Sequence, residues 1–463
     1  MLRRWFDLVN QNAEDIATLI TWENGKPLAE ARGEAAYAAS FLEWYSEEAT
    51  RIQGDTISAS SPNRRVLTIK QPVGVCGLIT PWNFPAAMLT RKIGPALAAG
   101  CTVVAKSPNE TPFTANALAE LSRRAGIPNG VINVITAADN TARVGNTLCE
   151  SPLVRKVSFT GSTQVGKLLM QQSSGTLKKL SLELGGNAPL IVFDDCPDLD
   201  AAVEGTMASK FRSSGQTCIC ANRIFVQETI YDEFAKKLAE KMKSTMRVGA
   251  GFDPNTTHGP LIHAAAVEKV SRHISDAVSR GASVVCGGRR SSSSAEDDHR
   301  SHTNQSNFFP PTLLTNVSRA SLIAREETFG PVAALFPFSN ESDVIAAANN
   351  IDQTGTSTST STSTSATTSI DKTAPAPAVS DKTEIDPTDD VGLAAYIFTA
   401  SLPRVWRLID ALEVGMVGVN TGLISDAAVP FGGVKMSGFG KEGGKEGIEE
   451  YLVRKSVTMG GLE

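Results

Sequence analysis

Short apolar runs alternate with helical patterns along most of this chain, and this alternation constrains the fold more than any other feature. Strand-like runs lie at 73–79, 101–105, 130–135 and 154–159, with helical patterns between them at 86–99 and 114–125. Parallel strands need crossover connections of this kind, which are almost always right-handed. We therefore expect an α/β fold built on mostly parallel sheets.

The same pattern extends to both ends of this region. Apolar residues from Leu2 to Ile20 recur at helical spacing and predict one first helix. Further along the chain, the strand pattern continues at 182–192 and 223–226, and the pattern at 230–246 predicts a long amphipathic helix. Two segments, 289–307 and 354–390, are rich in Ser, Thr and Asp and offer little to bury. We expect disordered insertions there, with a phosphorylated or glycosylated tract as the alternative.

Composition limits the classes of function. The 463 residues, 41% of them hydrophobic, allow two or more domains, and the net charge of −5 provides no basic field for nucleic acid. No apolar run has the length of a membrane span. Seven cysteines without framework spacing indicate a reducing compartment, and no Cys or His cluster predicts a metal site. We expect a cytoplasmic protein, or a mitochondrial one if the N-terminus is incomplete.

Cys218 lies in a small, polar segment that core packing does not explain. It follows Gly-Gln-Thr at 215–217, whereas structural cysteines usually have apolar neighbours. Backbone N–H groups in such a loop can stabilise a thiolate or an oxyanion. Cys218 is therefore a candidate nucleophile, and a packing cysteine is the alternative.

Two further polar side chains could face a site. Glu183 precedes Gly185 and Gly186, and a partly desolvated carboxylate at such a place has a raised pKa and can act as a general base. A strand residue paired with a cation is the alternative. Asn83 lies between two prolines and could donate its amide N–H to an oxyanion, or make an ordinary turn contact.

A glycine-rich turn follows the strand that ends at Phe159. Gly161, Ser162 and Gly166 place N–H groups at a helix N-terminus, which suits a pyrophosphate. The turn lacks the GxGxxG fingerprint, and an ordinary helix cap is the alternative.

Taken together, these motifs resemble the aldehyde dehydrogenase superfamily. Six motifs of this chain occur in the order and approximate spacing of the corresponding motifs in that superfamily. They are Thr-Pro-Trp-Asn-Phe-Pro at 80–85, Phe-Thr-Gly-Ser-Thr at 159–163, Leu-Glu-Leu-Gly-Gly at 182–186, Gly-Gln-Thr-Cys at 215–218, Glu-Glu-Thr-Phe-Gly-Pro at 326–331 and Pro-Phe-Gly-Gly at 430–433. The resemblance covers nearly the whole chain outside the two insertions. It implies a Rossmann-type coenzyme domain, an α/β catalytic domain and a small β extension for oligomerisation.

The resemblance also implies the catalytic roles. Cys218 would attack the aldehyde, with the oxyanion held by Asn83 and the Cys218 N–H. Hydride transfer to nicotinamide would leave a thioester, and Glu183 would activate the water that hydrolyses it. Glu327 and Phe329 correspond to positions that hold the nicotinamide ribose. The other cofactor-binding positions implied are Thr80, Trp82, Lys106, Gly161, Ser162 and Gly166.

Two stretches, 84–92 and 218–223, resemble the succinate-semialdehyde dehydrogenase branch of the superfamily. That resemblance implies that Arg91, Arg212 and Ser425 hold the distal carboxylate of the substrate, since a guanidinium can bind a carboxylate bidentately. Structural ion pairs are the alternative for the two arginines. Two other functions remain open: oxidation of another acidic aldehyde such as glutarate semialdehyde, or a catalytically inert protein of this fold.

The identity of the nicotinamide cofactor stays open between NAD and NADP. NAD-preferring relatives often carry Glu three residues after the lysine that matches Lys106, and this chain has Asn109 there, followed by Glu110. Without a carboxylate at that position, repulsion against a 2′-phosphate is removed, which makes NADP plausible.

The resemblance implies a domain organisation and a homo-oligomer. Relatives begin several dozen residues earlier, so we expect an N-terminally truncated coenzyme-binding domain. The expected boundaries are 1–50 and 71–185 for that domain and 186–436 for the catalytic domain. The oligomerisation strands are expected at 51–70 and 445–463. Dimers or tetramers follow by family analogy. The expected partners are a small aldehyde and other copies of the chain, with no nucleic acid or membrane.

Cys220 lies two residues after the candidate nucleophile. In some relatives such a pair forms a disulfide under oxidation, and Cys-x-Cys rings are strained and readily reducible. Cys220 is thus a candidate for a redox switch, and a passive second cysteine is the alternative.

Overall fold

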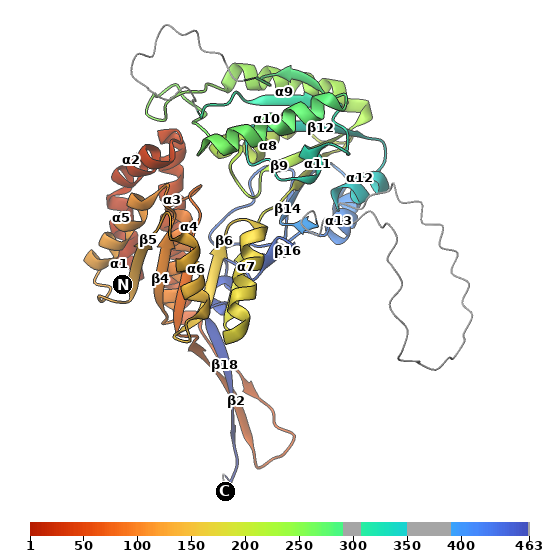
Figure 1. Cartoon of the computed structure of the whole chain (residues 1–463). Helices are drawn as coiled ribbons and strands as arrows, with labels where there is room; N and C mark the ends of the chain where they lie inside the picture. The colour runs from red at the N-terminus through yellow and green to blue at the C-terminus, as the bar shows by residue number, and fades with distance from the viewer. Residues whose placement is uncertain (290–306, 350–389, 462–463) are drawn as a thin grey trace, which may run out of the picture.

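The computed structural model describes residues 1–289, 307–349 and 390–461 of the chain. They form two parallel-rich sheets, each covered by helices, and a long antiparallel extension (Figure 1). The predicted insertions at 289–307 and 354–390 lie almost entirely outside the described residues. No helix in the described ranges is both long and apolar enough to cross a membrane.

The first sheet has six strands in the order β17-β7-β6-β3-β4-β5. Their bounds are β3 (Val75–Ile79), β4 (Thr102–Ser107), β5 (Ile132–Thr136), β6 (Val154–Thr160), β7 (Lys179–Glu183) and β17 (Gly438–Phe439). β3 to β7 are parallel, and β17 joins β7 antiparallel. The parallel α/β fold and the four strands expected in this region are thereby confirmed, with their ends shifted by a few residues.

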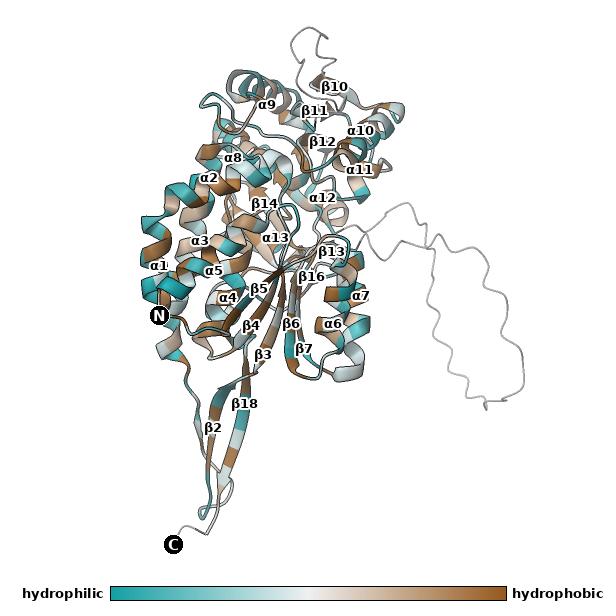
Figure 2. Cartoon of the chain, turned by 60° about the vertical axis from the view of Figure 1, so that its left-hand side comes forward, coloured by the Kyte–Doolittle hydropathy of each residue, from teal (hydrophilic) through white to brown (hydrophobic). Residues whose placement is uncertain are grey.

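Helices cover both faces of the first sheet. One face carries α1 (Leu2–Gln11), α2 (Ala13–Asn24), α3 (Leu28–Glu48), α4 (Ala87–Ala98) and α5 (Pro112–Arg124), and the other carries α6 (Thr141–Glu150) and α7 (Thr163–Ser173). Trp5, Phe41 and Leu78 are fully buried in the cluster on the first face, and Leu148 packs in a separate cluster on the second. The strands between these layers are mostly apolar (Figure 2).

The second sheet has seven strands in the order β10-β11-β12-β9-β8-β14-β15. They are β8 (Ala188–Val192), β9 (Ala221–Gln227), β10 (Ser283–Cys286), β11 (Thr312–Thr315), β12 (Val332–Phe338), β14 (Ala394–Phe398) and β15 (Met416–Val419), and only β10 is antiparallel to its neighbour. The accompanying helices are α8 (Leu199–Phe211), α9 (Tyr231–Thr245), α10 (Ala264–Ser279), α11 (Leu322–Arg325), α12 (Glu341–Ala348) and α13 (Leu402–Ala411).

A three-stranded antiparallel extension projects away from both sheets (Figure 1). It contains β1 (Thr56–Ile57), β2 (Arg65–Pro72) and β18 (Leu452–Met459), and β18 pairs with β2 along its whole length. The strands expected within 51–70 and 445–463 are thus present and paired with each other, and their part in oligomerisation stays a prediction. Two shorter features, the β13 (Val391–Gly392) and β16 (Val434–Lys435) ribbon and α14 (Glu446–Glu449), precede β18. The domain boundaries drawn from the sequence stay a prediction.

Two sequence-based expectations are wrong in detail. The single N-terminal helix is two helices, because Asn12 turns its side chain back to the Leu8 carbonyl, 2.7 Å away, and competes with the helical backbone. The run 182–192 is two strands, β7 and β8, which belong to different sheets. Gly185 and Gly186 lie between them and let the chain leave the first sheet for the second.

Candidate active site

The turn that carries Cys218 lies between α8 and β9. It begins with a short 3-10 segment, η3 (Arg212–Gly215), in which Ser213 and Ser214 have φ angles of 51° and 54°. A non-glycine residue in the left-handed region costs roughly 1–3 kcal/mol unless its surroundings hold it there. Glu30 contributes that support, since both of its carboxylate oxygens accept from the Ser213 N–H at 3.1 Å.

Two glycines from other motifs allow the chain to pack directly on this turn. A Cβ on Gly186 would lie 2.7 Å from the Cys218 carbonyl oxygen. A Cβ on Gly215, whose φ is +74°, would lie 2.1 Å from the Gly330 carbonyl oxygen. Neither approach is compatible with a larger residue. The segments after β7 and before β12 therefore meet at the turn of Cys218.

Asn83 is buried and held through both its side chain and its main chain. Its Nδ2 donates to the Gln216 carbonyl oxygen at 3.0 Å, and its own carbonyl accepts from Lys26 Nζ at 2.7 Å. Lys26 also pairs with Glu34 at 2.6 Å, and Glu34 accepts from the Ala86 N–H at 2.9 Å. Because the Asn83 amide has two N–H groups, one remains for an oxyanion formed at the turn.

The Cys218 thiol is protonated in this environment. Burial raises the pKa of Cys218 to about 12, and the Glu327 and Glu183 carboxylates act in the same direction, while Arg91 opposes them. A thiolate is the reactive form of cysteine. Attack by Cys218 therefore requires a base that can take its proton.

Glu183, the last residue of β7, has the properties of such a base. The residue is 3% exposed, and within the described part of the chain neither carboxylate oxygen has a hydrogen-bond partner. Burial raises the pKa of Glu183 well above its ordinary value, and Glu442 adds to this, against the opposing charges of Arg91 and Lys92. A carboxylate with a raised pKa can act as a general base near neutral pH.

A buried ion cluster lies beside Glu183. The Glu442 carboxylate contacts both the Arg91 guanidinium and the Lys92 ammonium, and all three side chains are at most 5% exposed. The guanidinium also lies 4.1 Å from the centre of the Phe431 ring. Removing one member of such a cluster would leave an uncompensated buried charge. Within the described residues, Arg91 Nη2 has no hydrogen-bond partner.

Sequence reasoning does not identify Lys92 or Glu442. Two signals were present: adjacent cations inside the apolar pattern at 86–99, and a glutamate flanked by glycines at 440–444. A buried charge needs a partner, so each signal predicts an ion pair without naming its partner. The two residues are 350 positions apart.

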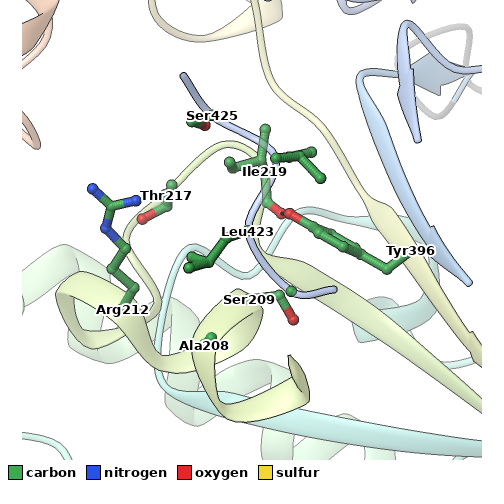
Figure 3. A pocket seen from close by; sticks show the side chains of 10 residues that line it. Ala208, Ser209, Arg212, Thr217, Ile219, Tyr396, Leu423 and Ser425 are labelled. Atoms are coloured by element: carbon green, nitrogen blue, oxygen red, sulfur yellow. Dashed lines mark hydrogen bonds between the residues drawn. The ribbon is translucent and has the colours of Figure 1, made fainter. Parts of the chain in front are cut away.

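A cavity of about 130 Å³ opens beside the turn (Figure 3). Arg212 and Ser425 line it, together with Thr217 and Ile219 on either side of Cys218. In the described part of the chain, no carboxylate lies within ion-pair distance of Arg212. Two of the three predicted carboxylate-binding residues thus share a cavity, while Arg91 lies outside its lining, in the buried ion cluster.

The predicted cofactor residues gather at the carboxyl ends of the strands of the first sheet. Thr80 follows β3, Lys106 lies near the end of β4, and Gly161 follows β6. Ligands of parallel α/β sheets bind at this end. Gly161 donates its N–H to the Glu183 carbonyl at 3.1 Å, and Ser162 caps α7. Gly166 is close-packed, since a Cβ there would lie 2.5 Å from the Leu184 side chain.

Lys106 is buried and Glu327 is half-buried, and nothing in the described chain neutralises either charge by an ion pair. Burial lowers the pKa of Lys106. Burial also raises the pKa of Glu327 to about 7, and this carboxylate accepts one long hydrogen bond, from the Gly186 N–H at 3.4 Å. Lysine fits a phosphate and a carboxylate fits ribose hydroxyls, so these residues suit a nicotinamide dinucleotide.

Phe329 and Trp82 lie together at this end of the site. Their rings meet edge to face with centroids 5.8 Å apart. Phe329 has a φ of 52°, a conformation that a phenylalanine rarely adopts. Backbone strain of this kind is found most often at functional sites. The part of Phe329 in cofactor binding stays a prediction.

Cys220 is buried behind the turn. Its thiol contacts the Lys210 carbonyl oxygen at 3.4 Å, and burial raises the pKa of Cys220. Cys218 and Cys220 are both free thiols. The redox role predicted for the pair is neither supported nor contradicted by this arrangement.

Comparison with known proteins agrees with the geometry. A model of the aldehyde dehydrogenase family matches residues 1–376 and 375–457. The chain is 51% identical over 460 residues to the NADP(+)-dependent succinate-semialdehyde dehydrogenase of Escherichia coli strain K12, covering 99% of the chain and 84% of that protein. It is 50% identical over 461 residues to a glutarate-semialdehyde dehydrogenase of Pseudomonas aeruginosa, covering 100% and 84%.

Solved structures give the same result. The crystal structure of succinate-semialdehyde dehydrogenase from Burkholderia pseudomallei superposes with a TM-score of 0.86 at 49% sequence identity, over 99% of the chain and 84% of that structure.

Proposed function

The chain belongs to the aldehyde dehydrogenase family, and from this premise we propose that it oxidises succinate semialdehyde to succinate with a nicotinamide dinucleotide. The observation that carries the proposal is the cavity beside Cys218. Arg212 and Ser425 line it, and together they offer a carboxylate a charged donor and a hydroxyl. An aldehyde with a distal carboxylate would therefore be oriented with its carbonyl at the thiol.

In the first chemical step, Cys218 loses its proton and attacks the aldehyde carbon. Because burial holds the pKa of Cys218 at about 12, the proton must go to a nearby base, and Glu183 with its raised pKa can accept it. The free N–H of Asn83 and the Cys218 N–H then stabilise the oxyanion of the thiohemiacetal. A nicotinamide dinucleotide held near Lys106 and Glu327 would supply the hydride acceptor for conversion of the thiohemiacetal to a thioester.

In the second step, water hydrolyses the thioester. Once the first proton has passed from Glu183 to solvent, Glu183 removes a proton from that water, and the Cys218 sulfur leaves as a thiolate that takes this proton back from Glu183. The absence of any hydrogen-bond partner on either Glu183 oxygen within the described chain leaves both free for this work. Asn83 serves again as the oxyanion donor.

NADP is the cofactor that the site favours. Asn109 is exposed where a carboxylate would repel a 2′-phosphate. Lys106 lies three residues before it without an ion-pair partner in the described chain, so its ammonium is available to a phosphate. The relative from Escherichia coli is named for NADP(+).

Glutarate semialdehyde is the second candidate substrate. It differs from succinate semialdehyde by one methylene, and a relative with 50% identity is named for it. One methylene in a pocket changes discrimination by roughly 10- to 200-fold. The ratio of kcat/KM for the two acidic aldehydes decides between them.

The test follows nicotinamide reduction by purified protein with succinate semialdehyde, glutarate semialdehyde and butanal, each with NAD and with NADP. We expect a strong preference for an acidic aldehyde, and no turnover by Cys218→Ala. Arg212→Ala should lower kcat/KM for the acidic aldehydes about 10- to 100-fold, because a hydrogen bond to a charged group contributes about 1.5–3 kcal/mol.

Two matched controls make this result specific. Cys149→Ala removes a buried thiol from α6, and Arg143→Ala removes an exposed charge from the same helix. Both should keep the wild-type rate and preference. Folded protein without turnover of any aldehyde would contradict the proposed function and favour an inert member of the family.

Oligomerisation through the extension is part of the proposal. Ile69 on β2 and Val453 on β18 are exposed apolar residues. A sheet face of this kind is stabilised by a second copy of the chain. Light scattering of the wild type and of Ile69→Lys with Val453→Lys tests it, and we expect a dimer or tetramer that the double variant weakens.

A reducing compartment such as the cytoplasm is the proposed location. All seven cysteines are free thiols in the structure, which suits a compartment that keeps thiols reduced. Fractionation of cells that express the tagged chain would test this, and recovery with mitochondria would contradict it.

A further inference from the structure

Tyr37, on α3, is a polar side chain that the proposed mechanism does not use. Its ring packs edge-on against Phe41, with the two centroids 4.8 Å apart. The Arg91 guanidinium lies 5.9 Å from the centre of the same Phe41 ring. Because Phe41 is fully buried, it fixes the Tyr37 ring on the side of α3 that faces Arg91.

The Tyr37 hydroxyl lies among the residues assigned to the substrate carboxylate. Ser425 and the charges of Arg91 and Arg212 all act on this hydroxyl. Ser425 and Arg212 line the cavity beside Cys218. Four groups with N–H or O–H donors thus converge from α3, α4, the turn after α8 and the segment after β15.

The phenol is a donor at neutral pH. Burial raises the pKa of Tyr37 above its ordinary value, although the two guanidinium groups and Ser425 oppose the shift. The hydroxyl therefore keeps its proton beside two cations. A protonated hydroxyl among cations suits an anionic ligand, and a carboxylate can accept from several such donors at once.

Arg91 and Arg212 differ in how much charge they can offer. Arg91 is already in contact with Glu442 in the buried ion cluster, whereas Arg212 has no ion-pair partner within the described residues. A carboxylate in the cavity would thus meet Arg212 as its main cation. Neutral donors then matter more for holding its second oxygen.

We propose that Tyr37 is a specificity-determining residue, whose hydroxyl donates a hydrogen bond to the distal carboxylate of the substrate beside Arg212 and Ser425. The inference rests on the proposed function, because it requires an aldehyde with a second, anionic end. It adds a residue from α3 to the three that the family resemblance implies.

Tyr37→Phe tests the proposal, since it removes the hydroxyl and keeps the ring against Phe41. The substrates are succinate semialdehyde and butanal, which has the same four carbons with a methyl group in place of the carboxylate. We expect kcat/KM for the acidic aldehyde to fall about 10- to 100-fold, mainly through KM, and the value for butanal to stay unchanged. An equal loss on both substrates would reduce Tyr37 to a structural role and overturn the proposal.

Inhibition of butanal oxidation by succinate is a second measurement that does not need turnover of the acidic aldehyde. The Ki for succinate should rise by a similar factor in Tyr37→Phe. Tyr231→Phe is the matched control, because its hydroxyl donates to the Leu335 carbonyl at 3.1 Å within the second sheet. That variant should change neither the Ki nor the ratio of the two substrates.

The same assays separate this proposal from the proposed function. A wild-type protein that oxidises butanal and not the acidic aldehyde would refute the proposed function, and the role of Tyr37 with it. A wild-type preference for the acidic aldehyde that persists unchanged in Tyr37→Phe would refute only the role of Tyr37.

Discussion

Asn83 donates its side-chain amide to the main-chain carbonyl of Gln216, 3.0 Å away and two residues before Cys218. The bond joins the segment after β3, in the first sheet, to the turn before β9, in the second. The proposed oxyanion donor and the proposed nucleophile are therefore held in one geometry although they come from different sheets. Such preorganised donors are usually the largest single contribution to acyl-transfer catalysis.

Asn83→Ala should lower kcat about 10²- to 10³-fold, as expected for the loss of one oxyanion donor. The KM for the aldehyde should change little, because the amide binds the transition state and not the carboxylate end of the substrate. Steady-state kinetics measures both quantities. Asn116→Ala, at an exposed position on α5, is the control. An equal fall of kcat in that variant would contradict the assignment of Asn83 as an oxyanion donor.

The sequence predicts the parts of this site that are encoded locally. Cys218, Glu183 and Asn83 each lie in a short motif whose glycines or prolines restrict the backbone. The structure gives the physical reason at Gly186, where a side chain would collide with the Cys218 carbonyl. A motif of this kind can be recognised in the sequence without knowing which residues contact it in the fold.

Contacts between segments that are distant in the sequence cannot be predicted from such local motifs. Arg91 illustrates the difference, since its sequence context does not say whether the guanidinium meets a ligand or a carboxylate of the chain. Glu442, which it contacts, comes from the far end of the sequence. The break at Asn12 is another example, because helical periodicity continues across it while the side chain caps the preceding turn.

Glu183→Gln should slow hydrolysis of the thioester about 10²- to 10⁴-fold, the usual contribution of general-base catalysis. Because Glu183 also takes the Cys218 proton in the first step, formation of the thioester should slow as well, and rapid mixing separates the two rates. We expect hydrolysis to be the slower step, so that a burst of reduced nicotinamide, stoichiometric with active sites, precedes slow turnover. Glu150→Gln, on the exposed end of α6, should behave as the wild type. A variant without a burst would place the defect before the thioester.

The pH dependence of the same step tests the protonation state of Glu183. A general base must be deprotonated, so the rate of thioester hydrolysis should rise with pH through the pKa of Glu183. Because burial raises that pKa above the usual carboxyl range, the rise should occur at higher pH than for an exposed glutamate. Glu327 has a pKa of about 7, and Glu327→Gln should keep this pH dependence while Glu183→Gln loses it.

Asn109→Glu should shift the preference from NADP toward NAD. A carboxylate three residues after Lys106 would repel a 2′-phosphate and could accept from the ribose hydroxyls of NAD. We expect the ratio of kcat/KM for NADP to that for NAD to fall at least about tenfold, which corresponds to roughly 1.4 kcal/mol. Asn116→Glu adds the same charge on nearby α5 and should leave the ratio unchanged; an equal shift there would mean a general charge effect.

Cys220→Ala should protect the protein from reversible oxidation if Cys218 and Cys220 form a disulfide. In that reaction two thiols lose two hydrogens to hydrogen peroxide, which becomes two water molecules. Cys220 is buried with its thiol at the Lys210 carbonyl, 3.4 Å away, so bridging requires the side chain to leave that contact. In the wild type we expect peroxide to inactivate the protein and dithiothreitol to restore its activity. Mass spectrometry should detect the disulfide-linked peptide.

The control for this experiment is Cys149→Ala, which removes another buried thiol and should leave the inactivation unchanged. Cys220→Ala blocks only the disulfide, because a lone Cys218 can still be oxidised to a sulfenic acid. Dithiothreitol distinguishes the two kinds of oxidation. Without Cys220 as a resolving thiol, longer exposure to peroxide should oxidise Cys218 to a sulfinic acid, and dithiothreitol should not restore the lost activity. Reversible inactivation of the same extent in Cys220→Ala would make Cys220 a passive neighbour.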